Sequence, residues 1–274
     1  MQSLNVNGTL MTYSESGDPH APTLFLLSGW CQDHRLFKNL APLLARDFHV
    51  ICPDWRGHDA KQTDSGDFDS QTLAQDLLAF IDAKGIRDFQ MVSTSHGCWV
   101  NIDVCEQLGA ARLPKTIVID WLLQPHPGFW QQLAEGQHPT EYVAGRQSFF
   151  DEWAETTDNA DVLNHLRNEM PWFHGEMWQR ACREIEANYR TWGSPLDRME
   201  SLPQKPEICH IYSQPLSQDY RQLQLDFAAG HSWFHPRHIP GRTHFPSLEN
   251  PVAVAQAIRE FLHGLSTCNH ELKR

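Results

Sequence analysis

The sequence predicts an α/β fold, built on a mostly parallel, doubly wound sheet with a helical cap inserted into it. Three observations lead to this prediction. Short apolar runs of strand length alternate with helical patterns over residues 1–121. The runs are continuously apolar, which is typical of strands buried on both faces. From residue 122 to residue 202 helical segments rich in tryptophan and charge replace the strands, and the alternation then resumes.

These patterns place the elements in chain order. A hairpin over residues 4–15 precedes two buried strands, at residues 23–27 and 49–52. The next helix, over residues 73–83, has its apolar positions at helical spacing and stops at Gly85, a usual helix-ending residue. Further strands are predicted at 89–92, 116–119, 207–212 and 235–239, and further helices at 97–108, 147–155, 158–170, 176–192, 219–229 and 252–265.

The domain organisation follows from the break in the alternation. We expect residues 1–121 and 203–266 to form one core domain, residues 122–202 to form the helical cap, and residues 267–274 to form a polar tail. A chain of 274 residues is long enough to bury such a core without disulfides.

Composition excludes several function classes. The formal net charge of −12, without any basic stripe, argues against a nucleic-acid partner. No apolar run approaches the roughly 18 residues of a membrane span, and the N-terminus lacks a signal-peptide pattern, so we expect no membrane association and a cytoplasmic protein. Seven cysteines without C-x-x-C spacing indicate reduced thiols. Ten tryptophans favour a pocket for a flat or apolar small molecule.

The segment Ser93-Thr94-Ser95-His96-Gly97 lies where a predicted strand turns sharply into a helix. It has the form of the nucleophile elbow G-x-S-x-G of the α/β-hydrolase fold, with the first glycine replaced by Ser93. A small residue is needed there because the turn brings strand and helix close together, and serine is small enough. Ser95 is therefore the candidate catalytic serine.

A histidine base and a carboxylate are expected after later strands, because ligands of an open parallel sheet bind at the carboxyl ends of its strands. His244, in a Gly-x-x-His loop after the last strand, has the position of the catalytic histidine. Asp120 directly follows an apolar strand, and Asp219 follows the next strand at the more common acid position. We favour Asp120, because Asp219 lies seven residues beyond Tyr212 and is predicted to cap a helix.

The backbone amides of Trp30 and His96 are candidate oxyanion-hole donors, because they follow the first core strand and the elbow serine. No metal is predicted. Although the chain has sixteen histidines, the string His231, His235 and His238 spans a loop, a proline and a strand, so these side chains would not share one face.

Several of these motifs together resemble those of the cofactor-independent ring-cleaving dioxygenases of the α/β-hydrolase fold, the 1H-3-hydroxy-4-oxoquinoline and 3-hydroxy-4-oxoquinaldine 2,4-dioxygenases. The likeness covers nearly the whole chain. The quinoline enzyme is the more similar, because the quinaldine enzyme has histidines where Gln32 and Thr94 stand here, two positions that would border the ring pocket. Enzymes that degrade 2-alkyl-3-hydroxy-4-quinolone signals belong to the same group. The segments that carry the resemblance are Ser28-Gly29-Trp30-Cys31-Gln32-Asp33-His34-Arg35, Asp54-Trp55-Arg56-Gly57-His58, Ser93-Thr94-Ser95-His96-Gly97-Cys98-Trp99, Ile119-Asp120-Trp121, Phe150-Asp151-Glu152-Trp153 and Thr243-His244-Phe245-Pro246.

The resemblance implies a reaction of a 3-hydroxy-4-oxoquinoline-type substrate with O2, without any cofactor. His244, assisted by Asp120, would remove the 3-hydroxyl proton, and the electron-rich ring would then react with O2 to release carbon monoxide and an N-acylanthranilate. Ser95 would hydrogen-bond the substrate, the Trp30 and His96 amides would hold its C4 oxygen, and Trp153 would pack against its ring.

Two other hypotheses remain open from the residues alone. The chain could be a serine esterase or C–C bond hydrolase with Ser95 as nucleophile, since motifs do not show whether the serine is acylated. It could instead be a non-enzymatic ligand binder on the same fold, against which the intact Ser95, Asp120 and His244 set argues. Dependence on oxygen separates the first hypothesis from these. The C2 substituent of the substrate and the choice between a monomer and a small homo-oligomer are left open by the sequence.

Overall fold

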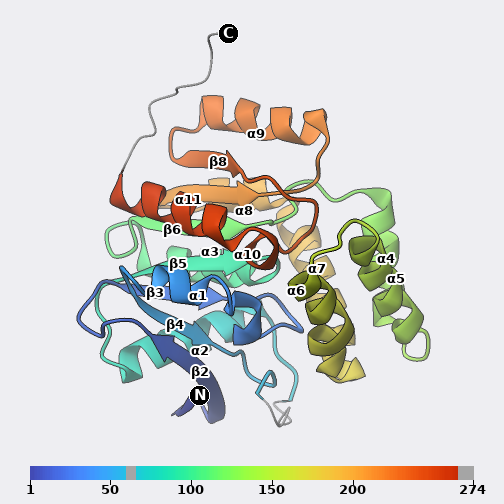
Figure 1. The fold of residues 1–274 in the computed structure, drawn as a ribbon, viewed down its shortest axis with the longest axis horizontal. Helices are drawn as coiled ribbons and strands as arrows, with labels where there is room; N and C mark the ends of the chain where they lie inside the picture. Colours follow the sequence, from blue (N-terminus) through green and yellow to red (C-terminus); the bar gives the residue numbers. More distant parts are fainter. Residues whose placement is uncertain (60–65, 265–274) are drawn as a thin grey trace.

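The computed structural model describes residues 1–59 and 66–264. An eight-stranded sheet with the order β1-β2-β4-β3-β5-β6-β7-β8 runs through the centre of the molecule (Figure 1). The β1–β2 and β2–β4 pairs are antiparallel, and the pairs from β4 to β8 are parallel. The strands are β1 (Gln2–Val6), β2 (Thr9–Ser16), β3 (Thr23–Leu27), β4 (His49–Pro53), β5 (Phe89–Thr94), β6 (Lys115–Ile119), β7 (Glu207–Tyr212) and β8 (Phe234–His238).

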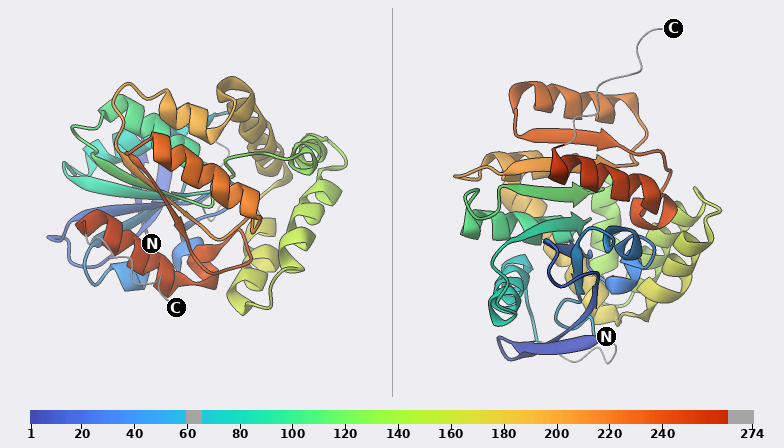
Figure 2. Two further views of the ribbon diagram at one scale, coloured as in Figure 1. Left: turned by 90° about the horizontal axis from the view of Figure 1, so that it is seen from above. Right: turned by 60° about the vertical axis from the view of Figure 1, so that its left-hand side comes forward.

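Helices cover both faces of this sheet and one of its edges (Figure 2). The helices of the core are α1 (Ala41–Leu44), α2 (Ser70–Ala83), α3 (Gly97–Leu108), α9 (Gln218–Gly230), α10 (Pro246–Glu249) and α11 (Pro251–His263), with a 3₁₀ turn at His34–Phe37. Between β6 and β7 lie α4 (Pro127–Gln137), α5 (Tyr142–Ala154), α6 (Ala160–Asn164), α7 (Gly175–Trp192) and α8 (Pro195–Glu200). A π-helical turn, His165–Glu169, and a 3₁₀ turn, Met170–Trp172, follow α6.

The predicted fold class is confirmed. The strands β3 and β4 are buried along their whole length, as their continuous apolar runs predicted. Helices α4, α5, α6 and α7 stand beside the carboxyl ends of the parallel strands, toward which the arrows of β5, β6 and β8 point in Figure 1. These helices therefore lie over the carboxyl ends of the strands, where ligands bind in open α/β folds.

The helix α4 was not predicted from the sequence. It begins at Pro127 behind His126, whose ring accepts a hydrogen bond from the Phe129 amide, and it contains two glycines, Gly128 and Gly136. Glycine is a poor helix former, and the helix has few aliphatic residues to mark a 3.6-residue period, so tertiary packing decides its structure.

The predicted polar tail, residues 267–274, lies outside the described residues.

The elbow requires close packing between the start of α3 and the end of β3. A β-carbon on Gly97 would lie 2.3 Å from the Ser28 carbonyl oxygen, so only glycine fits there. Ser93 is fully buried, and its hydroxyl accepts a hydrogen bond from Asn101 of α3 at 2.8 Å.

Within the described residues, no helix is long and apolar enough to cross a membrane.

Candidate active site

Ser95 lies at the point of the turn between β5 and α3. Its backbone has a φ of +52°, and its amide donates to the Ile119 carbonyl of β6 at 3.0 Å. A left-handed conformation is unfavourable for a non-glycine residue and persists where the surrounding structure enforces it. The strained turn exposes the Ser95 hydroxyl at the carboxyl end of the sheet, as the elbow motif predicted.

His244 lies directly beside this serine. The distance between His244 Nε2 and Ser95 Oγ is 2.8 Å, although the two residues are 149 positions apart in the sequence. Desolvation by the surrounding protein lowers the pKa of His244 to about 4, so its ring is neutral at physiological pH. A neutral imidazole within hydrogen-bond reach of the reacting groups has the geometry and the protonation state of a general base.

Asp120 is buried at the end of β6, with a φ of +46°. Its Oδ1 accepts hydrogen bonds from the Ser213 and Gln214 amides at 3.2 and 3.4 Å, and its Oδ2 accepts one from the Ser213 hydroxyl at 3.1 Å. Burial raises the pKa of this carboxyl to about 8, against the opposing effect of these donors. In the described structure it forms no hydrogen bond or ion pair with His244, so the direct contact that the sequence predicted is not present.

The group on the other ring nitrogen of His244 is Gln214. Its side-chain amide lies 3.3 Å from Nδ1, and its backbone amide is the one bound by Asp120. Asp120 is therefore linked to His244 through the loop after β7. The competing candidate, Asp219, is exposed in the first turn of α9, whose N-cap is Ser217 rather than Asp219. Asp120, and not Asp219, is thus part of the hydrogen-bond network that reaches His244.

The loop between β3 and the first 3₁₀ turn brings the Trp30 amide to the same place. Among the described residues, neither the Trp30 amide nor the His96 amide donates to a protein acceptor, whereas the neighbouring amides of Gly29 and Cys31 both do. Two free N–H groups beside a serine and a histidine are suited to hold an oxygen on which negative charge develops.

These groups face a largely apolar cavity of about 140 Å³. Burial lowers the pKa of His96 to about 3, so its ring in the cavity wall is neutral. The cavity is enclosed by the loops after the strands and by helices α4, α5 and α7. Its lining comprises Trp30, Gln32, Ser95, His96, Trp99, Trp121, Leu122, His126, Phe129, Gln132, Leu133, Phe149, Glu152, Trp153, Met170, Trp178, Ala181, Cys182, Ile185, Tyr189, Gln214, Pro215 and His244.

Of the two predicted ring-pocket residues Trp153 and Thr94, Trp153 lines the cavity and Thr94 does not. The Trp153 ring is stacked on the His244 ring, with 5.3 Å between ring centres and an interplanar angle of 14°. Trp153 therefore contacts the His244 ring and the cavity at the same time. Thr94 is buried outside the cavity lining, and its hydroxyl donates to the Ile119 carbonyl, whereas Gln32 does line the cavity.

Several buried polar groups in the cavity wall have no protein partner. The described structure gives none to either ring nitrogen of His96, nor to the indole nitrogens of Trp30, Trp121 and Trp178. Buried donors and acceptors are normally satisfied, so unpaired groups in the wall of a cavity indicate a ligand or water that bonds them. A heteroaromatic ligand with polar edges fits this wall better than a purely aliphatic one does.

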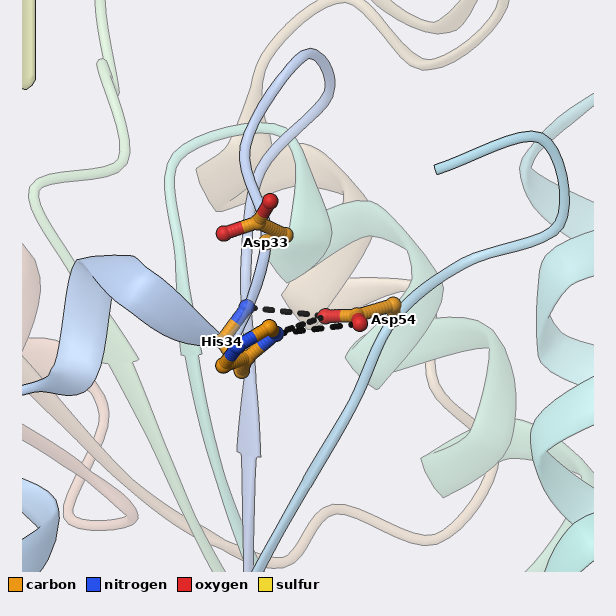
Figure 3. Close-up of side chains that lie close together, drawn as sticks. All are labelled: Asp33, His34 and Asp54. Atoms are coloured by element: carbon orange, nitrogen blue, oxygen red, sulfur yellow. Dashed lines mark hydrogen bonds and ion pairs between the residues drawn. The ribbon is translucent and has the colours of Figure 1, made fainter. Parts of the chain in front are cut away.

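Within the described residues, one group has the composition of a cation site, namely Asp33, His34 and Asp54 (Figure 3). These side chains already bond protein groups. The His34 ring bonds Asp54 at 3.0 Å, and the Asp33 carboxylate, which no dashed line joins to that pair, binds Arg35 at 2.7 Å. The histidine string is likewise dispersed, because His231 faces Glu200 and His235 faces Glu207. None of these residues lines the cavity.

Comparison with known proteins agrees with this geometry. The alpha/beta hydrolase family model matches residues 24–257. A 2-heptyl-3-hydroxy-4(1H)-quinolone dioxygenase from Mycobacteroides abscessus is 35% identical over 260 residues, which cover 94% of this chain and 97% of that protein. The chain belongs to the quinolone dioxygenases of the alpha/beta hydrolase family. The resemblance inferred from its motifs is therefore confirmed.

Solved structures of quinolone dioxygenases have the same fold over nearly the full length. The structure of 1H-3-hydroxy-4-oxoquinoline 2,4-dioxygenase is 99% identical, with a TM-score of 0.94, and the match covers 96% of this chain and 100% of that one. The structure of AqDC with its product, from work on the recognition and ring cleavage of the Pseudomonas quinolone signal, is 34% identical, with a TM-score of 0.93 and the same coverage.

Some site residues of this quinolone dioxygenase were not predicted from the sequence. Gln214 and Trp121 each lie two residues after the end of a strand, so the rule that ligands bind after strand ends could have found both. Tyr189 carries no such signal, because a buried aromatic residue of the core and one in a cavity wall look alike in sequence. Among the aromatic and methionine residues of the cap, Phe149 and Trp178 line the cavity, whereas Trp130, Phe150 and Met177 do not.

Proposed function

We propose that this enzyme cleaves the heteroaromatic ring of a 3-hydroxy-4(1H)-quinolone with O2, giving an N-acylanthranilate and carbon monoxide, with His244 as the base. The observation that carries the proposal is the convergence of His244, Ser95 and two unpaired amides on one aromatic cavity in a quinolone dioxygenase. The near-identical solved enzyme is named for a quinoline without a C2 substituent, which favours hydrogen at C2 here.

Catalysis begins with removal of the 3-hydroxyl proton by His244 Nε2. For Nε2 to accept it, Nδ1 carries the ring proton and Gln214 presents its amide oxygen to it, a side-chain orientation that the 3.3 Å contact allows. The Ser95 hydroxyl, 2.8 Å from Nε2, hydrogen-bonds the substrate oxygen and forms no acyl-enzyme. The imidazolium favours the ionised form of Asp120, and that carboxylate in turn stabilises the positive charge.

The remaining steps are reactions of the deprotonated substrate with O2. The deprotonated ring is electron-rich and gives an electron to O2 directly, so the reaction needs no metal or organic cofactor. A peroxide then forms at C2 and attacks C4, while the Trp30 and His96 amides hold the C4 oxygen as charge grows on it. Collapse of the bicyclic intermediate releases carbon monoxide, and both oxygen atoms of O2 remain in the N-acylanthranilate.

We further propose that residues 122–202 act as a cap over the core formed by residues 1–121 and 203–266. Helices α4, α5 and α7 contribute Phe129, Phe149 and Trp178 to the cavity wall. In this arrangement the core supplies the reacting groups and the cap excludes water from the anionic intermediate.

We place the enzyme in the cytoplasm, as a monomer or small homo-oligomer. The six cysteines of the described chain are buried and unpaired, as expected in a reducing compartment. Light scattering of the purified protein measures the oligomeric state.

The function is tested with metal-stripped enzyme and 3-hydroxy-4(1H)-quinolone, with and without oxygen. Decay of the ring absorbance with carbon monoxide in the headspace, only in air, is the expected result. No reaction in air, together with turnover of an aryl ester, would assign the hydrolase reaction instead, which the Ser95–His244 hydrogen bond also permits.

Ser95→Ala distinguishes ring cleavage from the hydrolase reaction, because it removes only the Ser95 hydroxyl oxygen. If Ser95 only hydrogen-bonds the substrate, kcat for ring cleavage falls by about 10-fold, which corresponds to the loss of one hydrogen bond. If Ser95 is a nucleophile, the rate falls to background. Steady-state oxygen consumption measures the difference.

Asp120→Asn tests whether the Asp120 carboxylate, which does not contact His244 directly, stabilises the imidazolium. We expect kcat to fall by about 10-fold, the effect of losing one pKa unit of imidazolium stabilisation. Asp219→Asn is the matched control, because this exposed residue on α9 should leave kcat unchanged. An unchanged rate for Asp120→Asn with a reduced rate for Asp219→Asn would reverse the assignment.

The pH profile tests the environment of His244. Because its pKa is lowered to about 4, kcat/KM of the free enzyme should not decline as the pH falls through about 6.5, where an exposed histidine takes up a proton. The decline should begin only as the pH approaches 4. An acid limb at about 6.5, with circular dichroism showing a folded protein, would contradict this environment.

A further inference from the structure

The loop of residues 28–32 holds most of its polar groups in fixed hydrogen bonds. The Gly29 amide donates to the Gln32 side-chain oxygen at 3.1 Å, and the Ser28 hydroxyl donates to the Gln32 carbonyl at 3.1 Å. The Trp55 indole nitrogen donates to the Ser28 carbonyl at 2.8 Å. Of the amides of Gly29, Trp30 and Cys31, only that of Trp30 has no partner within the described residues.

The amide that follows Trp30 is held by His58. The Cys31 amide donates to His58 Nε2 at 2.9 Å, and His58 Nδ1 lies 3.1 Å from the Arg56 carbonyl oxygen. A carbonyl oxygen only accepts, so Nδ1 carries the proton and Nε2 is the acceptor. These two contacts fix one neutral tautomer of His58, which is buried and whose pKa is lowered by that burial.

This hydrogen bond acts on a strained part of the loop. Cys31 has a φ of +55°, a left-handed conformation that is unfavourable for a residue with a side chain. The His58 ring also packs against the rings of Trp30 and Phe173, with centres 6.3 and 5.0 Å away. His58 itself does not line the cavity. It contacts the loop through the Cys31 amide and the Trp30 ring, from outside the cavity lining.

We propose that His58 is a positioning residue, which holds the Cys31 amide and thereby aims the Trp30 amide at the substrate oxygen. The inference rests on the proposed function, because the Trp30 amide matters only if charge develops on that oxygen. Without the acceptor at His58, the Cys31 amide is buried unpaired and the loop is free to leave the left-handed conformation, which turns the neighbouring Trp30 amide away.

Two variants separate hydrogen bonding from packing. His58→Phe keeps a ring against Trp30 and Phe173 but has no acceptor for the Cys31 amide. His58→Gln supplies both an acceptor for that amide and a donor for the Arg56 carbonyl. We expect kcat to fall by at least about 10-fold in His58→Phe with little change in KM, and to be largely kept in His58→Gln. Equal kcat values in the two variants would overturn the proposal.

A second readout is insensitive to stability alone. Anaerobic titration of the bound quinolone by absorbance gives the pKa of its hydroxyl group on the enzyme. Weaker stabilisation of the anion should raise this pKa by about one unit in His58→Phe and leave it unchanged in His58→Gln. An unchanged value in His58→Phe would assign His58 a purely structural role.

If His58→Phe does not fold, nitrogen NMR of the wild-type histidines decides the question. A proton on His58 Nε2 at the assay pH would overturn the proposal, and an unprotonated Nε2 would support it. The wild-type enzyme is assayed in parallel for oxygen-dependent release of carbon monoxide. Its inactivity would reject the proposed function, whereas an active wild type with equal variants would reject only the role of His58.

Discussion

His244→Ala is expected to lower the rate of ring cleavage by about 10² or more, the usual effect of removing a general base. His244 is the only imidazole that bonds Ser95 in the described structure, and its lowered pKa keeps it neutral and able to accept a proton. The variant should still bind the quinolone, because the aromatic wall of the cavity remains. Stopped-flow mixing with oxygenated buffer measures the rate.

The matched control is His235→Ala, because His235 lies near the start of β8, faces Glu207 at the start of β7 and does not line the cavity. Its rate should equal that of the wild type. Absorbance of the anaerobic complex gives a second readout, since His244→Ala should hold the neutral quinolone where the wild type holds its anion. Near wild-type turnover in His244→Ala would remove this histidine from the mechanism.

Arg198→Ala is expected to lower the free energy of unfolding by about 3–5 kcal/mol, the usual cost of breaking a buried ion pair. The Arg198 guanidinium is fully buried on α8 and bonds Asp103 and Glu106 of α3 at 2.9 and 2.7 Å. It also lies over the Trp192 ring at 4.1 Å. Removing it leaves the Asp103 carboxyl buried, where burial already raises its pKa.

Urea unfolding followed by circular dichroism measures this loss. Arg190→Ala is the control, because that guanidinium is largely exposed and its pair with Glu186 on the same helix contributes about 0.5 kcal/mol or less. The double variant Arg198→Met with Asp103→Leu should regain part of the stability, since it removes the buried carboxylate together with its partner and leaves only the Glu106 carboxylate, which solvent reaches. A loss below about 1 kcal/mol for Arg198→Ala would show that the ion pair does not anchor α8 to the core.

His244→Ala is expected to change the rate of the reaction, whereas Arg198→Ala is expected to change the stability of the fold. His244, the proposed base, lies at the carboxyl end of the sheet, and its loss should leave folding unchanged. Arg198 lies at the end of the segment between β6 and β7, and its loss should weaken the attachment of that segment to α3. A cap that is loosely attached would also expose the anionic intermediate to water, so kcat of Arg198→Ala reports on the contribution of the cap to catalysis.

The sequence by itself determined the elements whose signals are local. Continuous apolar runs predicted β3 and β4, because strands buried on both faces need no polar alternation. The small residues around Ser95 predicted the elbow, since the turn has no room for larger ones. The positions of Ser95, Asp120 and His244 after separate strands predicted a common site, because parallel strands end at the same edge of the sheet.

Only the tertiary structure decided which groups meet at that edge. It sets Gln214 rather than Asp120 beside His244 Nδ1, stacks Trp153 on the His244 ring and leaves Thr94 outside the cavity. Helix α4 likewise forms by packing against its neighbours, not from its own propensity. The physical reason is that the direction of a side chain at a strand end depends on the φ of one residue and on the loops packed around it. The contacts with those loops are long-range, so no local pattern of residues encodes them.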